Sequence, residues 1–328
     1  MPITSPDQIS YIDFEISSHC NLHCPQCARF DRDGFINKHM TLAHLNFDSI
    51  DKHIVLDELT NLQTVKFEGD HGEPLMHPDV DKFLNKFTAA VNVELTTNGS
   101  LRSQAWWTRL ATKPNLTVTF SIDGLKDTNH IYRINADFDK IIDNASTFIK
   151  AGGKAIWKFV VFNHNQHQLE QAQALSKQMG FVDFQYTYSN RNFYNNNEWP
   201  IMVNGEYQGQ LKMASAQLSV RQHTKTITWA KSANESFAPP TCSWSNRGHM
   251  YVNHRGHLLP CCMTSGHSWR KDISGQLWQK IVGDAELIDL HHHTLTEILR
   301  SDFYQTRLAE SFLSQRTAHH VCIGNCSR

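Results

Sequence analysis

The stretch that decides the fold is YIDFEISSHCNLHCPQC, residues 11–27. Its first seven residues form a largely apolar run of strand character, and the rest holds three thiols, Cys20, Cys24 and Cys27, at uneven spacing. Three thiolates can ligate three irons of a four-iron cube and leave the fourth iron open. An open iron binds a small molecule, so a cluster at this loop would perform chemistry as well as carry electrons.

Size and charge exclude several classes of protein. The chain has 328 residues, 40% of them hydrophobic, which suffices for one large α/β domain or a large and a small one. Its net charge of -1 provides no basic field for nucleic acid. No apolar run is long enough to span a membrane, and the first residues lack the pattern of a signal peptide. We therefore expect a cytoplasmic protein with no nucleic-acid partner and no membrane partner.

The eight cysteines fall into two groups. In a reducing cytosol such cysteines are metal ligands rather than disulfide partners. The front cysteines are Cys20, Cys24 and Cys27, and none follows until residue 242. The later group is Cys242, Cys261, Cys262, Cys322 and Cys326. This distribution predicts two metal sites on two structural units.

Strand-like and helical segments alternate through the first two-thirds of the chain. The predicted strands are 10–16, 63–69, 91–96, 116–122, 155–162 and 181–188. The predicted helices are 41–59, 78–90, 102–112, 137–151 and 166–179, with Thr41 and Ser103 as N-caps. Such β-α units predict an α/β fold, here a partial (β/α)6 TIM-like barrel. Its active site is expected at the carboxyl ends of the strands.

The alternation ends after residue 188. Residues 190–197 are expected to form a polar loop, and 205–232 are expected to be helical. Residues 250–259 predict a hairpin, and 294–300 and 302–314 predict helices. We therefore expect a barrel over 1–200, a connecting helical segment over 201–240, and a small C-terminal α+β cluster-binding domain, a β-hairpin plus helices, over 241–328.

The front triplet, spaced C-x3-C-x2-C after the first strand, resembles the signature of the radical S-adenosylmethionine (SAM) superfamily. The segment FEGDHGEPL, residues 67–75, is similar to the Gly-Gly-Glu-Pro segment with which that family holds the amino group of SAM. The resemblance implies that Gly72 and Glu73 do so here. The first glycine of the family's pair is His71 in this chain.

Further strand ends carry the resemblance. TTNG, residues 96–99, and SIDG, residues 121–124, match the ends of the family's third and fourth strands. The remaining SAM contacts that the resemblance implies are Asn98, Ser121, Asp123 and Arg133, with the arginine on the SAM carboxylate. The residue before the third cysteine is usually aromatic and lies near the adenine, but here it is Gln26. Val161 and Asn163 are therefore further candidates for adenine contacts.

The later cysteines resemble an auxiliary-cluster extension of that superfamily called SPASM, in its shorter twitch form. The resemblance implies one extra four-iron cluster on Cys242, Cys261, Cys322 and Cys326. Cys262 competes with Cys261, and the final C-x3-C departs from the usual C-x2-C. A structural zinc site of four cysteines is the alternative. The run His291-His292-His293 is expected to be a solvated loop.

The implied function is reductive cleavage of SAM to a 5'-deoxyadenosyl radical, which removes hydrogen from a substrate C–H bond. The auxiliary cluster would take the electron, so that a small polar substrate is oxidised overall. Tyr186, Tyr188 and Arg191 lie near the end of the last predicted barrel strand and are the candidate substrate contacts. Sulfatase maturases carry an aspartate beside the first auxiliary cysteine, where this chain has Ser243. The base that the oxidation needs stays open.

Two alternatives remain at this stage. One is a maturase that modifies or cross-links a peptide or protein side chain, and the other is a non-catalytic zinc or iron–sulfur protein. The expected partners are an external low-potential electron donor of the flavodoxin or ferredoxin type and a small-molecule or peptide substrate. Only about ten residues precede the first strand, which is too short for a leader-binding domain, so a separate leader-peptide-binding protein is a further expected partner.

Overall fold

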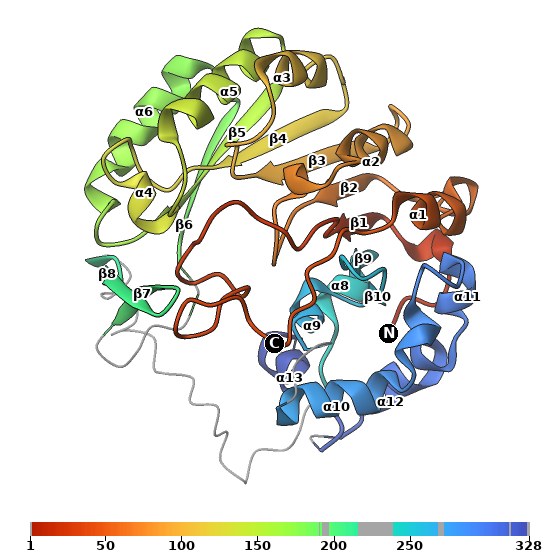
Figure 1. The fold of residues 1–328 in the computed structure, drawn as a ribbon. Helices are drawn as coiled ribbons and strands as arrows, with labels where there is room; N and C mark the ends of the chain where they lie inside the picture. Colours follow the sequence, from red (N-terminus) through yellow and green to blue (C-terminus); the bar gives the residue numbers. More distant parts are fainter. Residues whose placement is uncertain are drawn as a thin grey trace. The chain divides into compact units, whose positions relative to one another are not determined.

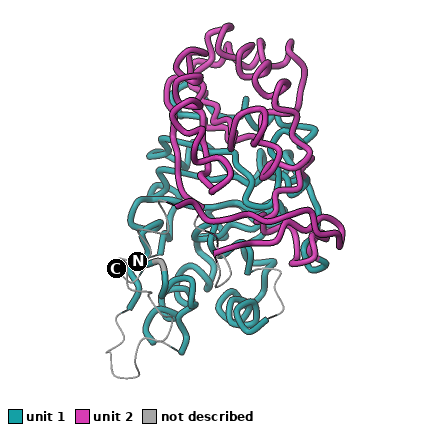
Figure 2. The backbone as a smooth tube through the Cα atoms, turned by 90° about the vertical axis from the view of Figure 1, so that its left-hand side faces the viewer, with its two compact units in different colours: residues 1–19, 38–93, 234–328 teal, residues 20–37, 94–233 magenta. Residues whose placement is uncertain are grey.

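The structure is a computed structural model that describes residues 2–189, 191, 197–215, 239–267, 272–314 and 316–326. The chain forms two compact units (Figure 2). Unit 1 comprises Met1–His19, Lys38–Val93 and Asn234–Arg328, and unit 2 comprises Cys20–Asn37 and Glu94–Ala233. These units differ from the predicted division at residues 200 and 240, because both ends of the chain belong to unit 1.

The strands of unit 1 explain why the two ends of the chain belong together. β1 (Tyr11–Phe14) pairs in parallel with β2 (Thr64–Phe67) and with β9 (His249–Val252), so that Tyr11 lies opposite both Thr64 and His249. β10 (Leu258–Leu259) pairs antiparallel with β9. The C-terminal hairpin thus adds directly to the first strand (Figure 1).

The helices of unit 1 are short, and several are single 3-10 turns. They are η1 (Pro6–Gln8), α1 (Phe47–His53), η2 (Leu56–Glu58), η3 (Pro74–Met76), α2 (Val80–Lys86), α8 (Ser243–Asn246), α9 (Cys262–Ser265), α10 (Ile273–Val282), η5 (Ala285–Ile288), α11 (Leu295–Leu299), the π-helix η6 (Phe303–Arg307), α12 (Leu308–Ser311) and α13 (His320–Cys326).

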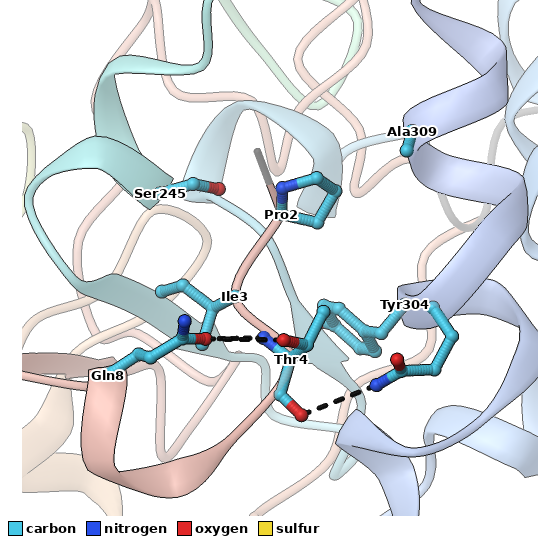
Figure 3. A pocket seen from close by; sticks show the side chains of 8 residues that line it. Pro2, Ile3, Thr4, Gln8, Ser245, Tyr304 and Ala309 are labelled. Atoms are coloured by element: carbon cyan, nitrogen blue, oxygen red, sulfur yellow. Dashed lines mark hydrogen bonds between the residues drawn. The ribbon is translucent and has the colours of Figure 1, made fainter.

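The N-terminal segment of unit 1 is fixed to its C-terminal helices (Figure 3). Gln8 Oε1 accepts a hydrogen bond from the Thr4 backbone N–H at 2.8 Å, and Gln305 Nε2 donates to the Thr4 carbonyl at 3.3 Å. The pocket beside these bonds is lined by Pro2, Ile3, Thr4, Gln8, Ser245, Tyr304, Gln305 and Ala309. This lining contains no carboxylate, imidazole or thiol, so it offers no metal ligand.

Unit 2 carries the remaining β-α units. β4 (Leu116–Ser121), β5 (Lys154–Val161) and β6 (Asp183–Tyr188) pair in parallel in that order. The boundary between the units falls within β3 (Asn92–Thr97). The antiparallel hairpin of β7 (Glu198–Val203) and β8 (Glu206–Lys212) follows. The helices are α3 (Gln104–Leu110), α4 (Asn129–Tyr132), α5 (Phe138–Lys150), η4 (Gln166–Gln168) and α6 (Leu169–Met179).

An aromatic core holds the helices of unit 2 on its sheet. β5 alternates between buried and less buried residues, as a half-buried strand does. The rings of Trp107, Phe120 and Phe148 join α3, β4 and α5 at centroid distances of 5.2–6.3 Å. Gly153 lies so close to the Phe148 ring that a Cβ atom would approach it to 2.5 Å. This packing leaves the carboxyl ends of the strands for the loops that carry chemistry.

The predicted α/β class is confirmed, as is the C-terminal hairpin with helices. All six predicted strands are present, and Ser103 caps α3 by accepting from the Trp106 N–H. The first predicted helix begins later than expected, because Asn46 rather than Thr41 provides its N-cap. Within neither unit do the described strands close into a ring.

The expected helical connection is wrong over residues 201–212, which form the rest of β7, a turn and β8. The turn is Asn204-Gly205, and both residues have positive φ, 49° and 87°. Such an Asn-Gly pair is a strong hairpin signal. Residues 216–238 lie outside the described residues, as do residues 190 and 192–196 of the expected polar loop.

Candidate metal centres and cofactor site

The front cysteines lie on one loop at the start of unit 2. Burial raises the pKa of the Cys24 thiol to about 12, Arg133 acts against this, and the Cys27 and Cys20 thiols raise it further. The three sulfurs are thus close enough to influence one another. Thiols in such a place ionise when a metal binds them, because the metal replaces the proton.

Buried donors fix the backbone of this loop. Arg29 is nearly fully buried, and its Nη1 donates to the carbonyl of Cys20 at 3.3 Å and to that of Leu22 at 3.5 Å. The indole Nε1 of Trp199, on β7, donates to the Pro25 carbonyl at 3.1 Å. Three backbone carbonyls between Cys20 and Cys27 are therefore held by side-chain donors.

N–H groups also approach two of the sulfurs. The Leu22 backbone N–H lies 3.4 Å from Cys20 Sγ, and Asn98 Nδ2 lies 3.9 Å from it. Arg133 Nη1 lies 3.9 Å from Cys24 Sγ. N–H groups near the sulfurs of an iron–sulfur cluster tune its reduction potential. The donor set and its surroundings fit a four-iron cluster.

Arg133 is oriented by a buried carboxylate. Asp123 is fully buried, and its Oδ2 accepts from Arg133 Nε at 2.6 Å while its Oδ1 accepts from the Val160 N–H at 2.6 Å. Burial would lower the pKa of Arg133, but the charge of Asp123 outweighs it, so the guanidinium stays charged. Each oxygen of Asp123 thus accepts one hydrogen bond, and the bond from Nε orients the Arg133 guanidinium.

The other predicted SAM residues of unit 2 have different surroundings. Asn98 Nδ2 donates to Asn21 Oδ1 at 2.9 Å, which joins the end of β3 to the cysteine loop. Ser121 ends β4 with no hydrogen bond from its hydroxyl to any described residue. Val161 is buried within β5, whereas the Asn163 side chain is exposed.

Gln26 is buried beside the front cysteines. Its Oε1 accepts from the Ser189 hydroxyl at 2.9 Å, just after β6, while its Nε2 has no partner within the described part of the chain. A buried amide N–H without a partner costs free energy, so it is available to a bound acceptor.

The three candidate substrate contacts lie on or after β6. Tyr186 and Tyr188 share one face of the strand, with ring centroids 6.4 Å apart, and Tyr186 is 55% exposed. Arg191 is exposed and lies near enough to Tyr132 to lower the pKa of that phenol, against the larger effect of burial. Arg191 and Arg133 thus both lie near the Tyr132 phenol.

In unit 1 the Gly72-Glu73 segment docks on the end of the first strand. A Cβ atom on Gly72 would lie 1.8 Å from the Ser17 carbonyl oxygen, so no other residue fits. The Glu73 backbone N–H donates to the His19 carbonyl at 2.8 Å, and its side chain caps η3 (Pro74–Met76). This explains locally why the segment needs glycine and glutamate at these positions.

Four of the later cysteines surround one cavity in unit 1. The lining residues are Cys242, Ser243, Trp244, Pro260, Cys261, Met263, Thr264, Leu308, Phe312, Val321, Cys322 and Cys326. Burial raises the pKa of Cys261 to about 12, and Cys242 adds to it. Burial, with Cys261, Cys326 and Cys242, also raises the pKa of Cys322. These are the four cysteines that the resemblance implies, and they fit one metal cluster in an apolar shell.

Cys262 faces a different environment from that of Cys261. It does not line the cavity, and burial followed by the charge of Asp70 raises its pKa. Cys261 precedes α9, and its carbonyl accepts from the Thr264 hydroxyl at 2.7 Å. The geometry therefore favours Cys261 as the ligand.

Helix α13 explains why the last two cysteines can be spaced C-x3-C instead of the usual C-x2-C. Residues four apart lie on the same face of a helix, so Cys322 and Cys326 both reach the cavity. The Thr241 backbone N–H donates to the Cys326 carbonyl at 3.1 Å. The last cysteine is thus tied to the residue beside Cys242.

A buried polar network in unit 1 was not predicted from the sequence. Glu15 is fully buried and accepts from the His71 backbone N–H at 2.6 Å and from the Tyr251 hydroxyl at 3.1 Å, and it lies 3.0 Å from His254 Nδ1. Burial would raise its pKa, but His71 and His254 outweigh it and hold the pKa below its usual value. The histidine that replaces the family's glycine at position 71 therefore belongs to this network.

Comparisons with known proteins agree with this geometry. The family model of the SPASM iron–sulfur cluster-binding domain matches residues 242–327. Streptococcus suis SuiB has a similar structure, with a TM-score of 0.57 and 15% identity over 90% of this chain and 67% of SuiB. The structure of native anSMEcpe with bound AdoMet is similar as well, with a TM-score of 0.56 and 18% sequence identity over 97% of this chain and 89% of anSMEcpe. Residues 242–327 thus match an iron–sulfur cluster-binding domain, and the chain shares its fold with SuiB and anSMEcpe.

A curated relative extends the likeness in sequence. The GTP 3',8-cyclase of Clostridium botulinum (strain Okra / Type B1) is 25% identical over 149 residues, which are 44% of this chain and 40% of that enzyme. The chain thus matches less than half the length of this relative. These findings agree with the predicted cofactors, since the matched family model is that of an iron–sulfur cluster-binding domain and anSMEcpe is known with bound AdoMet. No helix among the described residues has the length and apolar character to cross a membrane.

Several residues that hold the site escaped prediction because their partners are distant in sequence. Arg29 and Trp199 fix the cysteine loop, Ser189 binds Gln26, and His254 meets Glu15 across 239 positions. One signal was available for Glu15, since it and Asp13 are acidic residues within a strand run whose other residues are mostly apolar. A buried acidic residue requires a partner, although the sequence does not say which.

Proposed function

We propose that this protein is a radical SAM enzyme whose front cysteines hold a four-iron cluster with one open iron. When bound, cluster and SAM together supply a 5'-deoxyadenosyl radical that removes hydrogen from a substrate C–H bond. The observation that carries this proposal is the loop itself, in which the Cys24 thiol lies near those of Cys20 and Cys27, with Asn98 and Arg133 N–H groups close to the Cys20 and Cys24 sulfurs.

The residues of unit 2 have distinct roles in this proposal. Arg133 offers the SAM carboxylate the N–H groups that Asp123 does not occupy, since Asp123 accepts only from Nε. The Ser121 hydroxyl and the Gln26 Nε2, neither of which has a partner among the described residues, are available to SAM as well. The resemblance implies that Gly72 and Glu73 hold the amino group of SAM.

The auxiliary site favours net oxidation of a small polar substrate. Its four thiols can occupy all four irons of a cluster, which leaves no iron open to the substrate. Its role is then to accept the electron that the substrate radical loses, while the proton goes to a base. An external donor of the flavodoxin or ferredoxin type would reduce the front cluster.

A peptide or protein maturase is the second candidate. It is favoured by structures of similar fold, since SuiB is known bound to its precursor peptide SuiA and anSMEcpe with Cp18Cys and Kp18Cys peptides. Tyr186 and Arg191 offer exposed aromatic and cationic groups that suit a peptide equally well. The two candidates are separated by measuring whether one preparation of the protein turns over small alcohols or peptides. Turnover of peptides alone favours the maturase.

The proposal is tested by incubating anaerobically reconstituted protein with SAM and dithionite. We expect 5'-deoxyadenosine from the native chain and none from a C20A/C24A/C27A variant, because the variant cannot hold the cluster. The iron remaining in the variant shows that the auxiliary site and the fold persist. Native protein that binds iron and SAM but forms no 5'-deoxyadenosine contradicts the proposal.

A further inference from the structure

Three histidines of the SPASM domain converge outside the cysteine cavity. They are His267, which follows α9, and His319 and His320 at the start of α13. One ring nitrogen from each lies within 4.8 Å of the others. His267 and His319 are buried, whereas His320 is exposed. The histidine run at 291–293, which is more conspicuous in the sequence, forms no such group in the described part of the chain.

The Ser274 hydroxyl lies among these nitrogens. Its Oγ is 2.6 Å from His267 Nδ1, 3.3 Å from His319 Nε2 and 3.4 Å from His320 Nε2. His319 Nε2 also lies 3.2 Å from the Ser274 carbonyl. The Ser274 Oγ is thus within hydrogen-bond distance of all three imidazole nitrogens, and the donor atoms of one tetrahedral zinc, with bonds of about 2.0–2.1 Å, lie roughly 3.3 Å apart.

The rings are also held in this arrangement. The His319 ring packs edge-on against Trp278 of α10, with centroids 5.9 Å apart and planes at 82°. The His319 and His320 rings lie 4.4 Å apart, and His267 is 4.5 Å from His319. Three imidazoles this close repel one another when protonated, whereas neutral imidazoles are preferred ligands of zinc and related ions.

We propose that His267, His319 and His320, with the Ser274 hydroxyl or a water as the fourth ligand, bind a divalent transition metal of the zinc type. The metal would join three segments: the one after Cys261, the start of α10, and α13 with Cys322 and Cys326. It would thereby hold two cysteine-bearing segments in place whether or not the auxiliary cluster is present. The exposed His320 leaves this site open to exchange with metal in solution.

The test is a titration of the reconstituted, cluster-loaded protein with Co²⁺, followed by visible absorption. The proposal expects the d–d bands of a cobalt site without the thiolate-to-cobalt charge-transfer band that cysteine ligands would add. His320→Ala should weaken Co²⁺ binding at least tenfold, because an exposed ligand is lost without a change to the core. His292→Ala, an exposed histidine of the other run, should bind as the native protein does.

A second readout does not depend on cobalt spectra. Zinc should raise the melting temperature of the native protein and of His292→Ala but not that of His320→Ala, since only a folded site binds the ion. Equal iron contents in all three proteins would show that both clusters are intact. The proposal is overturned if no cobalt bands form, if they carry the thiolate band, or if His320→Ala binds Co²⁺ as tightly as the native protein.

Discussion

The two cysteine sites of this chain are built in opposite ways. The front site takes its three thiols from eight consecutive residues of unit 2 and places polar N–H groups near two of the sulfurs. The auxiliary site takes four thiols from three distant segments of unit 1 and lines the cavity between them with apolar side chains such as Trp244, Leu308 and Phe312.

This difference indicates different tasks. A three-thiol site surrounded by hydrogen-bond donors suits the binding of a polar cofactor at an open iron, whereas a four-thiol site in an apolar shell suits electron transfer without exchange of ligands. The front site is a local sequence motif, and the auxiliary site exists only once the fold has formed.

The largest effect that would break this comparison concerns the choice between adjacent cysteines. We expect Cys261→Ala to lose about four of roughly eight irons per chain, because Cys261 lines the cavity. Cys262→Ala is the matched control and should keep its iron, since Cys262 lies toward Asp70 and Asp13. Iron and sulfide analysis of both variants shows which cysteine is the ligand. Loss of iron from Cys262→Ala but not from Cys261→Ala would assign the site to Cys262.

A smaller effect would sharpen the role of the front site. Arg133→Lys should weaken SAM binding about 10–100-fold, because lysine keeps the charge but loses the planar set of donors that Asp123 orients. The auxiliary iron should be unchanged. Arg109→Lys, on the exposed face of α3, is the control and should bind SAM normally. Equilibrium binding of SAM measures the difference, and equal affinity of all three proteins would remove Arg133 from the site.

The smallest effect concerns the buried carboxylate of Glu15, which joins His71, Tyr251 and His254 within unit 1. Its folded pKa lies below the unfolded value of ~4.3, so its contribution to stability is present above that pH and is lost as the pH falls toward the folded pKa. Glu15→Gln should lower the free energy of unfolding at neutral pH by about 1.5–3 kcal/mol and flatten its decline in acid.

Urea unfolding between neutral and acidic pH measures this effect. Glu310→Gln, an exposed glutamate of the same unit, should leave the pH dependence unchanged. A variant at Glu15 with the same acid slope as the native protein would show that the network with His71 and His254 does not hold an ionised carboxylate.

The sequence predicted local features better than distant ones. The front cysteines, the strands and the helix cap at Ser103 depend on neighbouring residues, and all are where they were expected. The hairpin of β7 and β8 lies where the sequence predicts helix although Asn204-Gly205 marks its turn, because β8, EYQGQLK, carries mostly polar residues and lacks the usual pattern of a strand.

The parts that escaped prediction depend on pairings between distant segments. The Glu15 network requires β1 and β9 to pair, and the hydrogen bond from Trp199 to the Pro25 carbonyl requires β7 to lie beside the cysteine loop. No spacing in the sequence encodes those contacts.

The central claim is that the two cysteine groups hold two separate four-iron clusters. The most direct measurement is the iron, sulfide and zinc content of anaerobically reconstituted protein. We predict about eight irons and eight sulfides per chain, the content of two four-iron cubes, falling to about four of each in the C20A/C24A/C27A variant. Cysteine-bound zinc without sulfide, or iron that does not fall in that variant, would contradict the account.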